Sequence, residues 1–452
     1  MTRTIIAFLG LLVPLAASAQ DVPEAAPVTV PVEIRAAPAA SGSGPASVLI
    51  AGGKVHTLGA DGTIEGGDVL ISGGKIVAVG RDLVAPEGAQ VVNARDRIVT
   101  PGLMTSYSQL GITEIELVRE TADVETSGKV AEAAFDVADA INPNSTLIPI
   151  TRIEGITRAL VAPLDGPHVF AGQAAIIHLG NGPDLVVKRR AGMFAFLGPV
   201  GGNMERYRRP ESWAAFREAI AEAREYQAMK AEAGRIGQPR DQRNARIDLE
   251  ALLPVIAGEE PLVVYADRAS DIRQALAFGA AENVKLVILG GTEAWEVAKE
   301  LADAKVPVLI DPEHNLPQNF GSLGSTLANA KRLDEAGVTV AFSSASEQYA
   351  HNARRMGQLA GNAVANGMPY ERALAAITKN PAEIWGIADT YGTLEAGKDA
   401  DVVVWDGDPL ETGTAPVAVF IKGERMALES RQSKLRERYR DLSQKNPPFG
   451  YR

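Results

Sequence analysis

Seven side chains that could do chemistry follow runs of apolar, β-branched residues. They are Asp165, His168, Asp267, Arg268, Asp311, Glu313 and His314. The densest group is Asp311-Pro-Glu-His314, whose carboxylates and imidazole could run acid–base chemistry, bind a polar ligand or hold a metal ion in a new place. The alternative interpretation is a hydrogen-bonded loop without chemistry. The five histidines of the chain never occur with H-x-H or H-x-x-x-H spacing, so the sequence contains no familiar metal-binding motif.

The elements that must position these residues alternate between strands and helices. Apolar runs at 261–266, 284–290, 306–311 and 338–343 are typical of buried strands, and 270–279 and 292–304 are typical of helices. Ser270 is the expected N-cap of the first helix, and Gly279 its expected end. Continuous apolar strands alternating with helices favour a parallel sheet covered by helices. At this length the pattern predicts an α/β fold, a (β/α)₈ TIM-type barrel over 101–388, with its functional end at the carboxyl ends of the strands.

A second, smaller domain is predicted from both ends of the chain. Residues 46–100 contain two strand–Gly-Gly-turn–strand units, and 389–428 contain two further apolar runs bounded by Asp and Gly. Two hairpins do not close a sandwich alone, so the distant strands must complete it. We therefore expect a small antiparallel β-sandwich into which the barrel is inserted.

The first 45 residues are expected to lie outside both domains. Residues 1–19 resemble a secretory signal peptide, with Arg3, an apolar run over 5–16 and the small-x-small site Ala17-Ser-Ala19. Residues 20–45 are rich in Pro and Ala and predict a flexible or partly extended tether. The sequence thus predicts export, in a bacterium to the periplasm, with no membrane span after signal cleavage.

Composition narrows the partners and the chemistry. The formal net charge is −11, which disfavours nucleic acid and anionic membranes as partners. The chain contains no cysteine, so disulfides and thiolate chemistry are excluded.

A charged helical insertion is expected over 206–246, and a helix with a tail over 429–452. In the insertion, apolar residues recur at spacings of three and four. They are Trp213, Phe216, Ile220, Ala223 and Tyr226. This stripe indicates either a surface helix packed on the barrel or a helix that acts as a lid or binds a partner.

Three ordered segments carry a resemblance to a known family. They are the paired strands of 48–79, Val99-Thr-Pro-Gly-Leu103 leading into the next strand, and 373–387 followed by 392–404. Together they resemble the imidazolonepropionase-like branch of the amidohydrolase superfamily, and the resemblance covers nearly all of 46–423.

The resemblance implies a set of metal ligands that this sequence lacks. Such proteins hold one or two divalent metals with two His on the first barrel strand, a bridging Lys or Glu, single His on strands five and six, and an Asp on strand eight. In this sequence Tyr107 and Gln109 replace the His pair, Tyr265 stands at strand five, Gly290-Gly291 ends strand six, and the strand-eight position falls near Ser344 or Ala345. A phenol, with a pKa of about 10, is a poor ligand at neutral pH. The strand that bears the bridging residue cannot be assigned from the sequence.

The combined interpretation is an exported amidohydrolase-superfamily protein that has lost its metal site and acts as a ligand-binding protein or a non-catalytic partner subunit. The binding residues are then Tyr107, Gln109, His168, Tyr265, Arg268 and Glu313. No metal or other cofactor is expected. Partners would be a small molecule, a second copy of the chain, or an active amidohydrolase relative.

Two alternatives stay open. The first is an active hydrolase of non-peptide C–N bonds, in an amide or cyclic amide, with a rearranged site at Asp311, His314 and Asp267. A divalent metal such as zinc would be needed only under that alternative. The second is a structural subunit of an oligomer with 206–246 at the contact.

Overall fold

The computed structural model describes residues 34–35, 47–128, 130–166, 168–197, 208–231, 243–317, 319–344, 349–440 and 443. The signal peptide predicted at 1–19 lies outside these ranges, as does most of the tether. Within the predicted tether, Ile34–Arg35 (β1) is extended and pairs antiparallel with Gln90–Asn93 (β5). Within the described ranges, no helix has the length and apolar character needed to cross a bilayer.

Strands dominate the first part of the chain, and helices alternate with strands after it. The strands are Val48–His56 (β2), Thr63–Ser72 (β3), Lys75–Gly80 (β4), Ile98–Pro101 (β6), Leu103–Ser108 (β7), Ile156–Val161 (β8), Phe170–Gln173 (β9), Ala175–His178 (β10), Val186–Lys188 (β11), Met193–Phe196 (β12), Leu262–Ala266 (β13), Leu286–Gly290 (β14), Val308–Ile310 (β15), Val340–Phe342 (β16), Val402–Trp405 (β17), Pro416–Ile421 (β18) and Glu424–Arg425 (β19). The α-helices are Leu147–Arg152 (α1), Arg209–Ala231 (α2), Arg246–Ile256 (α3), Ala269–Glu282 (α4), Ala298–Asp303 (α5), Asn329–Glu335 (α6), Met356–Ala365 (α7), Tyr370–Ala375 (α8), Lys379–Ile384 (α9) and Arg431–Arg440 (α10).

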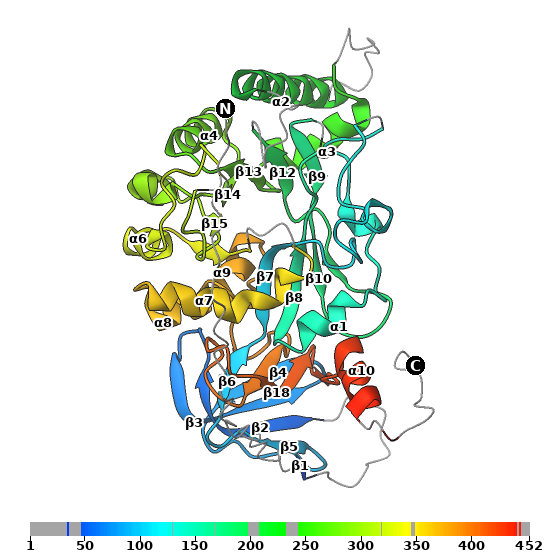
Figure 1. The fold of residues 1–452 in the computed structure, drawn as a ribbon, viewed down its shortest axis with the longest axis vertical. Helices are drawn as coiled ribbons and strands as arrows, with labels where there is room; N and C mark the ends of the chain where they lie inside the picture. Colours follow the sequence, from blue (N-terminus) through cyan, green and yellow to red (C-terminus); the bar gives the residue numbers. More distant parts are fainter. Residues whose placement is uncertain are drawn as a thin grey trace, which may run out of the picture.

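Strands from both ends of the chain form one sheet, at the bottom of Figure 1. Strand β17 connects the strands of the two chain ends, because it pairs antiparallel with β6 on one side and with β18 on the other. The origin of the strands is as predicted. The sequence predicted a small antiparallel β-sandwich; the hydrogen bonds join all nine strands into a single sheet, in which β2 pairs parallel with β5 and β6.

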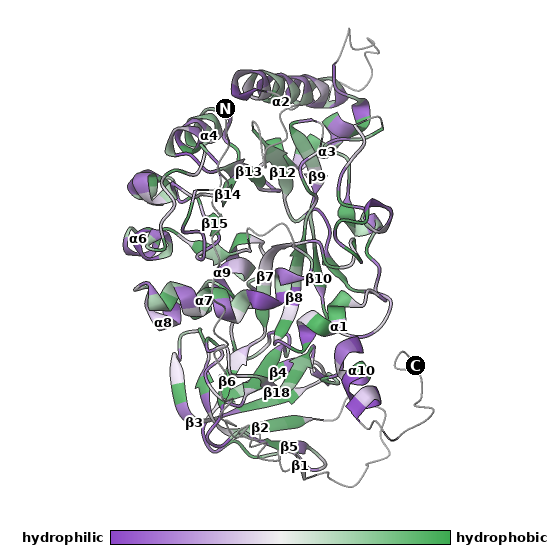
Figure 2. Ribbon diagram, viewed as in Figure 1, coloured by the Kyte–Doolittle hydropathy of each residue, from purple (hydrophilic) through white to green (hydrophobic). Residues whose placement is uncertain are grey.

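Period-2 alternation gives this sheet two apolar faces. Val402 and Val404 lie in a core enclosed by the sheet itself, together with Val99 and Phe420. The intervening Val403 belongs instead to the large core of the neighbouring unit. Figure 2 shows the mainly hydrophobic strand β2 of this sheet and the mainly hydrophilic helix α10. The alternate residues of β17 thus attach the sheet to the rest of the protein.

The middle of the chain is an α/β unit built on two sheets. One has the order β16-β15-β14-β13-β12-β9, in which β12 to β16 run parallel. The other has the order β11-β10-β8-β7, in which β7 and β8 run parallel. The chain passes from one sheet to the other at Ala174, the single residue between β9 and β10. The sequence predicted eight parallel strands; the described strands include seven parallel ones, with antiparallel strands between them.

A short backbone segment bridges the other edges of the two sheets. The N–H of Met104 in β7 donates to the carbonyl oxygen of Ile377 at 2.8 Å, and the N–H of Phe342 in β16 donates to that of Ala376 at 3.2 Å. The edge strands therefore bond to this segment, which follows α8, in place of direct pairing with each other. Asn380 supports it by donating from Nδ2 to the carbonyl oxygen of Val340 at 2.7 Å.

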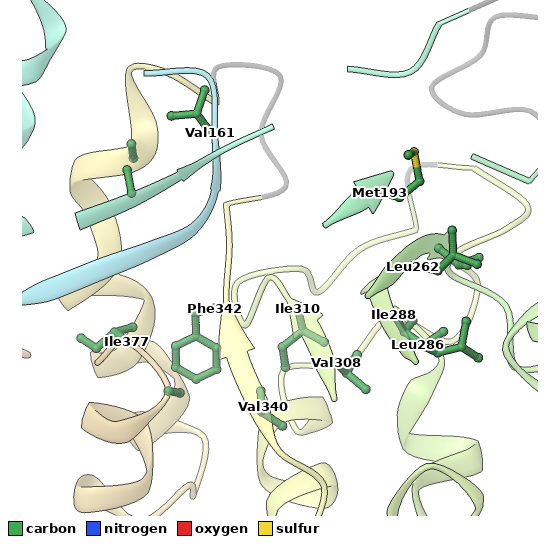
Figure 3. Close-up of a cluster of buried hydrophobic side chains, with 14 of the residues drawn as sticks. Val161, Met193, Leu262, Leu286, Ile288, Val308, Ile310, Val340, Phe342 and Ile377 are labelled. Carbon is green, nitrogen blue, oxygen red and sulfur yellow. The ribbon is translucent and has the colours of Figure 1, made fainter. Parts of the chain in front are cut away.

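The apolar strands explain the interior of this unit. Figure 3 shows part of its core, where Val308, Ile310, Val340 and Phe342 lie among other buried residues of the parallel strands. Each of these four side chains is at most 1% exposed. Strands that are buried on both faces have continuous apolar runs in their sequences, and the sequence shows such runs at these positions.

Helix α4 begins and ends differently from the prediction. It starts at Ala269 after Arg268, and Ser270 makes no capping hydrogen bond. Its end is Asn283, whose left-handed φ of 52° stops the helix. Gly279 lies inside the helix and does not end it. A Cβ at this position would approach the side chain of Leu286 to 2.3 Å. That glycine permits close packing of α4 on β14.

Helix α2 packs on the body of the protein, as one of the two interpretations of its apolar stripe predicted. Trp213, Phe216, Ile220 and Ala223 are buried, and the Phe216 ring lies 5.2 Å from that of Phe170 and 4.7 Å from that of Phe278. Tyr226, the last residue of the stripe, donates to Glu250 of α3 at 2.5 Å.

A buried ion cluster joins the sheet of the chain ends to the α/β unit. Arg158 of β8 donates to Asp401 at 2.8 Å and to Asp399 at 2.7 Å, and its side chain is fully buried. Burial acts to raise the pKa of Asp399, but hydrogen bonds from Lys75 and Arg158 outweigh it and hold that pKa below its usual value. These two aspartates therefore neutralise an arginine of the inserted domain.

Candidate functional site

A single cavity lies at the carboxyl ends of β7, β12, β13, β14, β15 and β16. It offers about 80 Å³ to the centres of water-sized spheres, where one water needs roughly 10–15 Å³. The space therefore suits a small organic molecule or a group of waters. The described lining residues are Tyr107, Leu164, Asp165, Phe196, Tyr265, Asp267, Leu289, Gly290, Thr292, Asp311, His314, Asn319, Asn329, Ser343, Ser344 and Tyr349.

Tyr107 of β7 fills the position of the first expected metal ligand. It is 4% exposed, and its hydroxyl donates to the carbonyl oxygen of Pro163 at 3.2 Å. Its ring meets the ring of Tyr349 edge-on at 4.9 Å and 84°. Burial raises the pKa of Tyr107 well above its usual value, and the neighbouring phenols of Tyr349 and Tyr265 act in the same direction. The residue is therefore a neutral phenol that closes the floor of the cavity.

Tyr265 and Asp267 form a hydrogen-bonded pair at the end of β13. The Tyr265 hydroxyl donates to Asp267 Oδ2 at 2.6 Å, while Asp267 Oδ1 accepts from the Thr292 hydroxyl at 2.6 Å. Burial raises the pKa of Tyr265 far above its usual value, and the charge of Asp267 adds to that shift. A phenol thus stands where the resemblance implies a histidine, and it is held by a carboxylate two residues later.

Asp311 and His314 also face the cavity, from the loop after β15. Asp311 Oδ1 accepts from the backbone N–H of Glu313 at 2.8 Å, which makes a tight turn at the strand end. Nε2 of His314 is buried and has no hydrogen-bond partner among the described residues. These two side chains are the described groups best placed to exchange a proton with a molecule in the cavity.

Four residues predicted to bind lie away from the cavity lining, and two of them have side-chain partners elsewhere. Glu313 accepts from Arg355 at 2.5 Å and from Asn362 at 2.6 Å, so it ties its loop to α7. His168 lies 3.4 Å from Glu132. Arg268 precedes α4 as its N-cap residue.

The fourth of these residues is Gln109, which follows the end of β7 and is buried outside the lining. Its backbone carbonyl oxygen accepts from the backbone N–H groups of Ile112 and Thr113. Its position is set by this turn and no longer by the alternation of the strand.

Several lining residues were missed from the sequence. Phe196 lies directly beside Tyr265 because β12 and β13 pair in parallel in that register, and its ring stacks on Tyr265 at 5.7 Å. Asn329 begins α6 and donates from Nδ2 to the carbonyl oxygen of Gly291 at 2.9 Å. The apolar run 193–196 was the available signal for Phe196, whereas no local pattern marks Asn329.

The donor set of the cavity does not fit the metal centre that the family resemblance implies. Of the positions that should carry imidazoles or a carboxylate, the lining holds Tyr107, Tyr265, Gly290 and, after β16, Ser344, while Gln109 lies outside it. Gly290 has no side chain, and both phenols are held neutral by burial. Across the part of the chain that the structure describes, no group of three or more His, Cys, Asp or Glu residues could hold a metal ion.

Comparison with known proteins agrees with the architecture. The model of the Amidohydrolase family matches residues 259–426. An amidohydrolase structure from Thermotoga maritima superimposes with a TM-score of 0.75 at 25% identity, covering 84% of this chain and 99% of that one. An imidazolonepropionase of Symbiobacterium thermophilum is 28% identical over 238 residues, which is 44% of this chain and 55% of that enzyme. The chain belongs to the amidohydrolase superfamily.

Curated members of the superfamily are longer than the part that they share with this chain. An amidohydrolase of Hapsidospora irregularis is 26% identical over 378 residues, which is 75% of this chain but 37% of that protein. The matched part therefore spans between about a third and about half of these two curated relatives. Their similarity identifies a superfamily member, and its ligand and activity must be argued from its own cavity.

Proposed function

We propose that this amidohydrolase-superfamily protein binds a small organic molecule at the carboxyl ends of its parallel strands without the metal centre of the family. One observation carries the proposal: apart from Gln109, the described positions expected to bear metal ligands meet in one cavity, and there they hold two phenols, a glycine and a serine. A single substitution could be compensated by a neighbour. Substitutions on several strands that meet at one place favour a site rebuilt for another purpose.

The chemistry of the replacements supports binding over metal-assisted hydrolysis. In a metal-dependent hydrolase the ion lowers the pKa of bound water so that hydroxide exists at neutral pH. Phenols with raised pKa values and serine hydroxyls are poor ligands for such an ion. They are, however, good hydrogen-bonding and packing groups for a small molecule.

Metal analysis of the full chain, purified without chelators, tests the proposal first. We expect far less than one equivalent of zinc, iron or manganese per chain; a stoichiometric amount of any of them would overturn it. A thermal-shift screen of small molecules tests the cavity itself. We expect Leu164→Trp, which fills the cavity wall, to abolish the shifts, while Leu316→Trp at an exposed position outside the lining should preserve them. Shifts that persist in Leu164→Trp would place the ligand elsewhere.

A second candidate function is hydrolysis of a non-peptide C–N bond by acid–base residues. It is favoured by the curated relatives, which are named as an amidohydrolase and an imidazolonepropionase, and by the buried, unpartnered Nε2 of His314 at the cavity. In this candidate His314 would exchange a proton with the substrate and Asp311 would stand beside it. Turnover of amide or cyclic amide substrates that falls at least 100-fold in His314→Gln and Asp311→Asn would support it. Turnover equal to that of the parent protein would refute these assignments.

We further propose that the two sheets of the α/β unit are the parts of one (β/α)₈-type barrel, closed at one seam by the 376–377 backbone. Export and association with a second copy or with an active relative also remain proposals. The apolar stripe of α2 is buried within its own chain, so an oligomer contact in this region would have to use other residues.

A further inference from the structure

The cavity combines aromatic walls with acidic side chains. Four rings line it, those of Tyr107, Phe196, Tyr265 and Tyr349, and three carboxylates, those of Asp165, Asp267 and Asp311. The described lining residues include neither lysine nor arginine. Aromatic faces and carboxylates both attract positive charge, because the face of a π-system is electron-rich.

Asp267 is the carboxylate whose surroundings are most informative. Its described partners are the Tyr265 hydroxyl, and the hydroxyl and backbone N–H of Thr292. All three donors are neutral, and the described residues include no lysine, arginine or histidine in an ion pair with Asp267. The half-buried carboxylate therefore has no counter-ion among those residues. A cationic ligand would supply one.

The rings are arranged so that they present surfaces in different directions. The Tyr107 and Tyr349 rings are nearly perpendicular, at 84°, whereas Tyr265 and Phe196 are stacked, with 24° between their planes. Burial keeps the phenols of Tyr107 and Tyr265 un-ionised by raising their pKa values, so the rings retain neutral faces. Rings around one cavity in several orientations can contact a compact cation from more than one side.

Asn329 adds an oriented acceptor to the same wall. Its Nδ2 donates to the carbonyl oxygens of Gly291 and Thr292, which requires that the amide oxygen occupy the other position. That Oδ1 is buried and lacks a partner among the described residues, in a residue that is 5% exposed. A buried acceptor left unsatisfied is costly, and a ligand N–H or O–H donor would satisfy it.

We propose that the cavity binds a small organic ammonium cation, with Asp267 as its counter-ion and the rings of Tyr107, Phe196, Tyr265 and Tyr349 as its walls. This inference rests on the proposed binding function and specifies the class of ligand. The combination of rings, acidic groups and an acceptor gives a cation an advantage over a neutral molecule of the same shape. The cavity then selects among ligands of similar shape by the charge of the ligand and not by its size.

The test compares choline with 3,3-dimethylbutan-1-ol, in which a neutral carbon replaces the quaternary nitrogen. Isothermal titration calorimetry on the full chain should show choline binding and at least tenfold weaker binding of the alcohol. Asp267→Asn should weaken choline at least tenfold and leave the alcohol unchanged. Asp303→Asn, which makes the same charge change on an exposed residue of α5, should bind choline like the parent protein.

Each outcome separates the inference from the function on which it rests. Equal affinity for choline and the alcohol, with both lost in Leu164→Trp, would overturn the cation inference and leave the binding function in place. Absence of choline binding would also overturn it, while the binding function would be decided by its own screen. If Asp267→Asn fails to fold, Phe196→Leu is used in its place. Loss of one ring face should weaken the binding of choline several-fold more than the binding of the alcohol. Equal effects on the two affinities would overturn the inference.

Discussion

Glu260 provides a prediction whose magnitude can be worked from the structure. The residue is 3% exposed and lies two residues before the start of β13, and neither of its carboxylate oxygens has a partner among the described residues. Burial raises the pKa of Glu260 from 4.5 to about 8. The folded protein thus holds a proton that the unfolded chain releases as pH rises above about 4.5.

The sign of the effect on stability follows from this proton. Between about pH 4.5 and 8 the folded state binds more protons at this residue than the unfolded state, so the free energy of unfolding falls as pH rises. The loss is about 1.4 kcal/mol per pH unit. Over the interval between the two pKa values it accumulates to about 5 kcal/mol, with about 3 kcal/mol reached by pH 7.

Glu260→Gln removes the titration and keeps the shape of the side chain. Urea unfolding followed by tryptophan fluorescence at pH 5, 7 and 9 should give a variant that becomes progressively more stable than the parent as pH rises. Glu259→Gln is the matched control, because that side chain is exposed, and its stability should follow the parent at all three values. A constant difference between Glu260→Gln and the parent from pH 5 to pH 9 would refute the reasoning.

Three further predictions concern stability. Arg158→Leu leaves the carboxylates of Asp399 and Asp401 facing each other without their buried cation and should lower the free energy of unfolding by about 3–5 kcal/mol; an unchanged urea midpoint would contradict the assigned cluster. Phe216→Ala opens a cavity beneath α2 and should cost about 3–5 kcal/mol, whereas Phe320→Ala, at a residue 89% exposed, should stay within about 0.5 kcal/mol of the parent. Because the folded pKa of Asp399 is depressed, its stabilising effect is present above its unfolded pKa of about 3.9 and is lost as pH falls through the folded value. Acid titrations of the parent and Asp399→Asn should therefore diverge below about pH 4, and parallel curves would contradict that assignment.

The sequence could predict those site residues whose position depends only on a strand end. Tyr265, Asp267, Asp311 and His314 stand at or just after β13 and β15, and parallel strands bring such positions to one edge. The family resemblance, and not this rule, placed Tyr107 on the first barrel strand, and Tyr107 also lines the cavity. A strand-end rule needs no knowledge of distant contacts, which is why it succeeded for these residues.

Prediction failed where a distant partner decides the direction of a side chain. Glu313 follows β15 but turns to Arg355, which is 42 residues away along the chain. Gln109 was grouped with Tyr107 by the spacing of the family motif, yet β7 ends at Ser108, so strand alternation no longer controls it. Asn329 and Tyr349 reach the cavity from outside the strands, and their local sequences give no sign of this.

Architecture was predictable in outline for a similar reason. Apolar runs located β13 to β16 and β17, whereas the division of β17 between two cores at Val403 was seen only in the structure. The antiparallel strands between β8 and β12 and the single nine-stranded sheet depend on pairings between segments. Those pairings depend on the packing of whole elements against one another, and the local pattern of apolar and polar residues carries no information about that packing.

The 376–377 bridge has a consequence for the solubility of folding intermediates. β7 and β16 each end a sheet, and an uncovered edge strand can recruit a strand from another molecule. Because one short backbone segment bonds to both strands, its detachment would expose two templates for intermolecular pairing at once. We therefore expect disruption of the 376–377 segment to appear first as precipitation during refolding and only afterwards as loss of ligand binding.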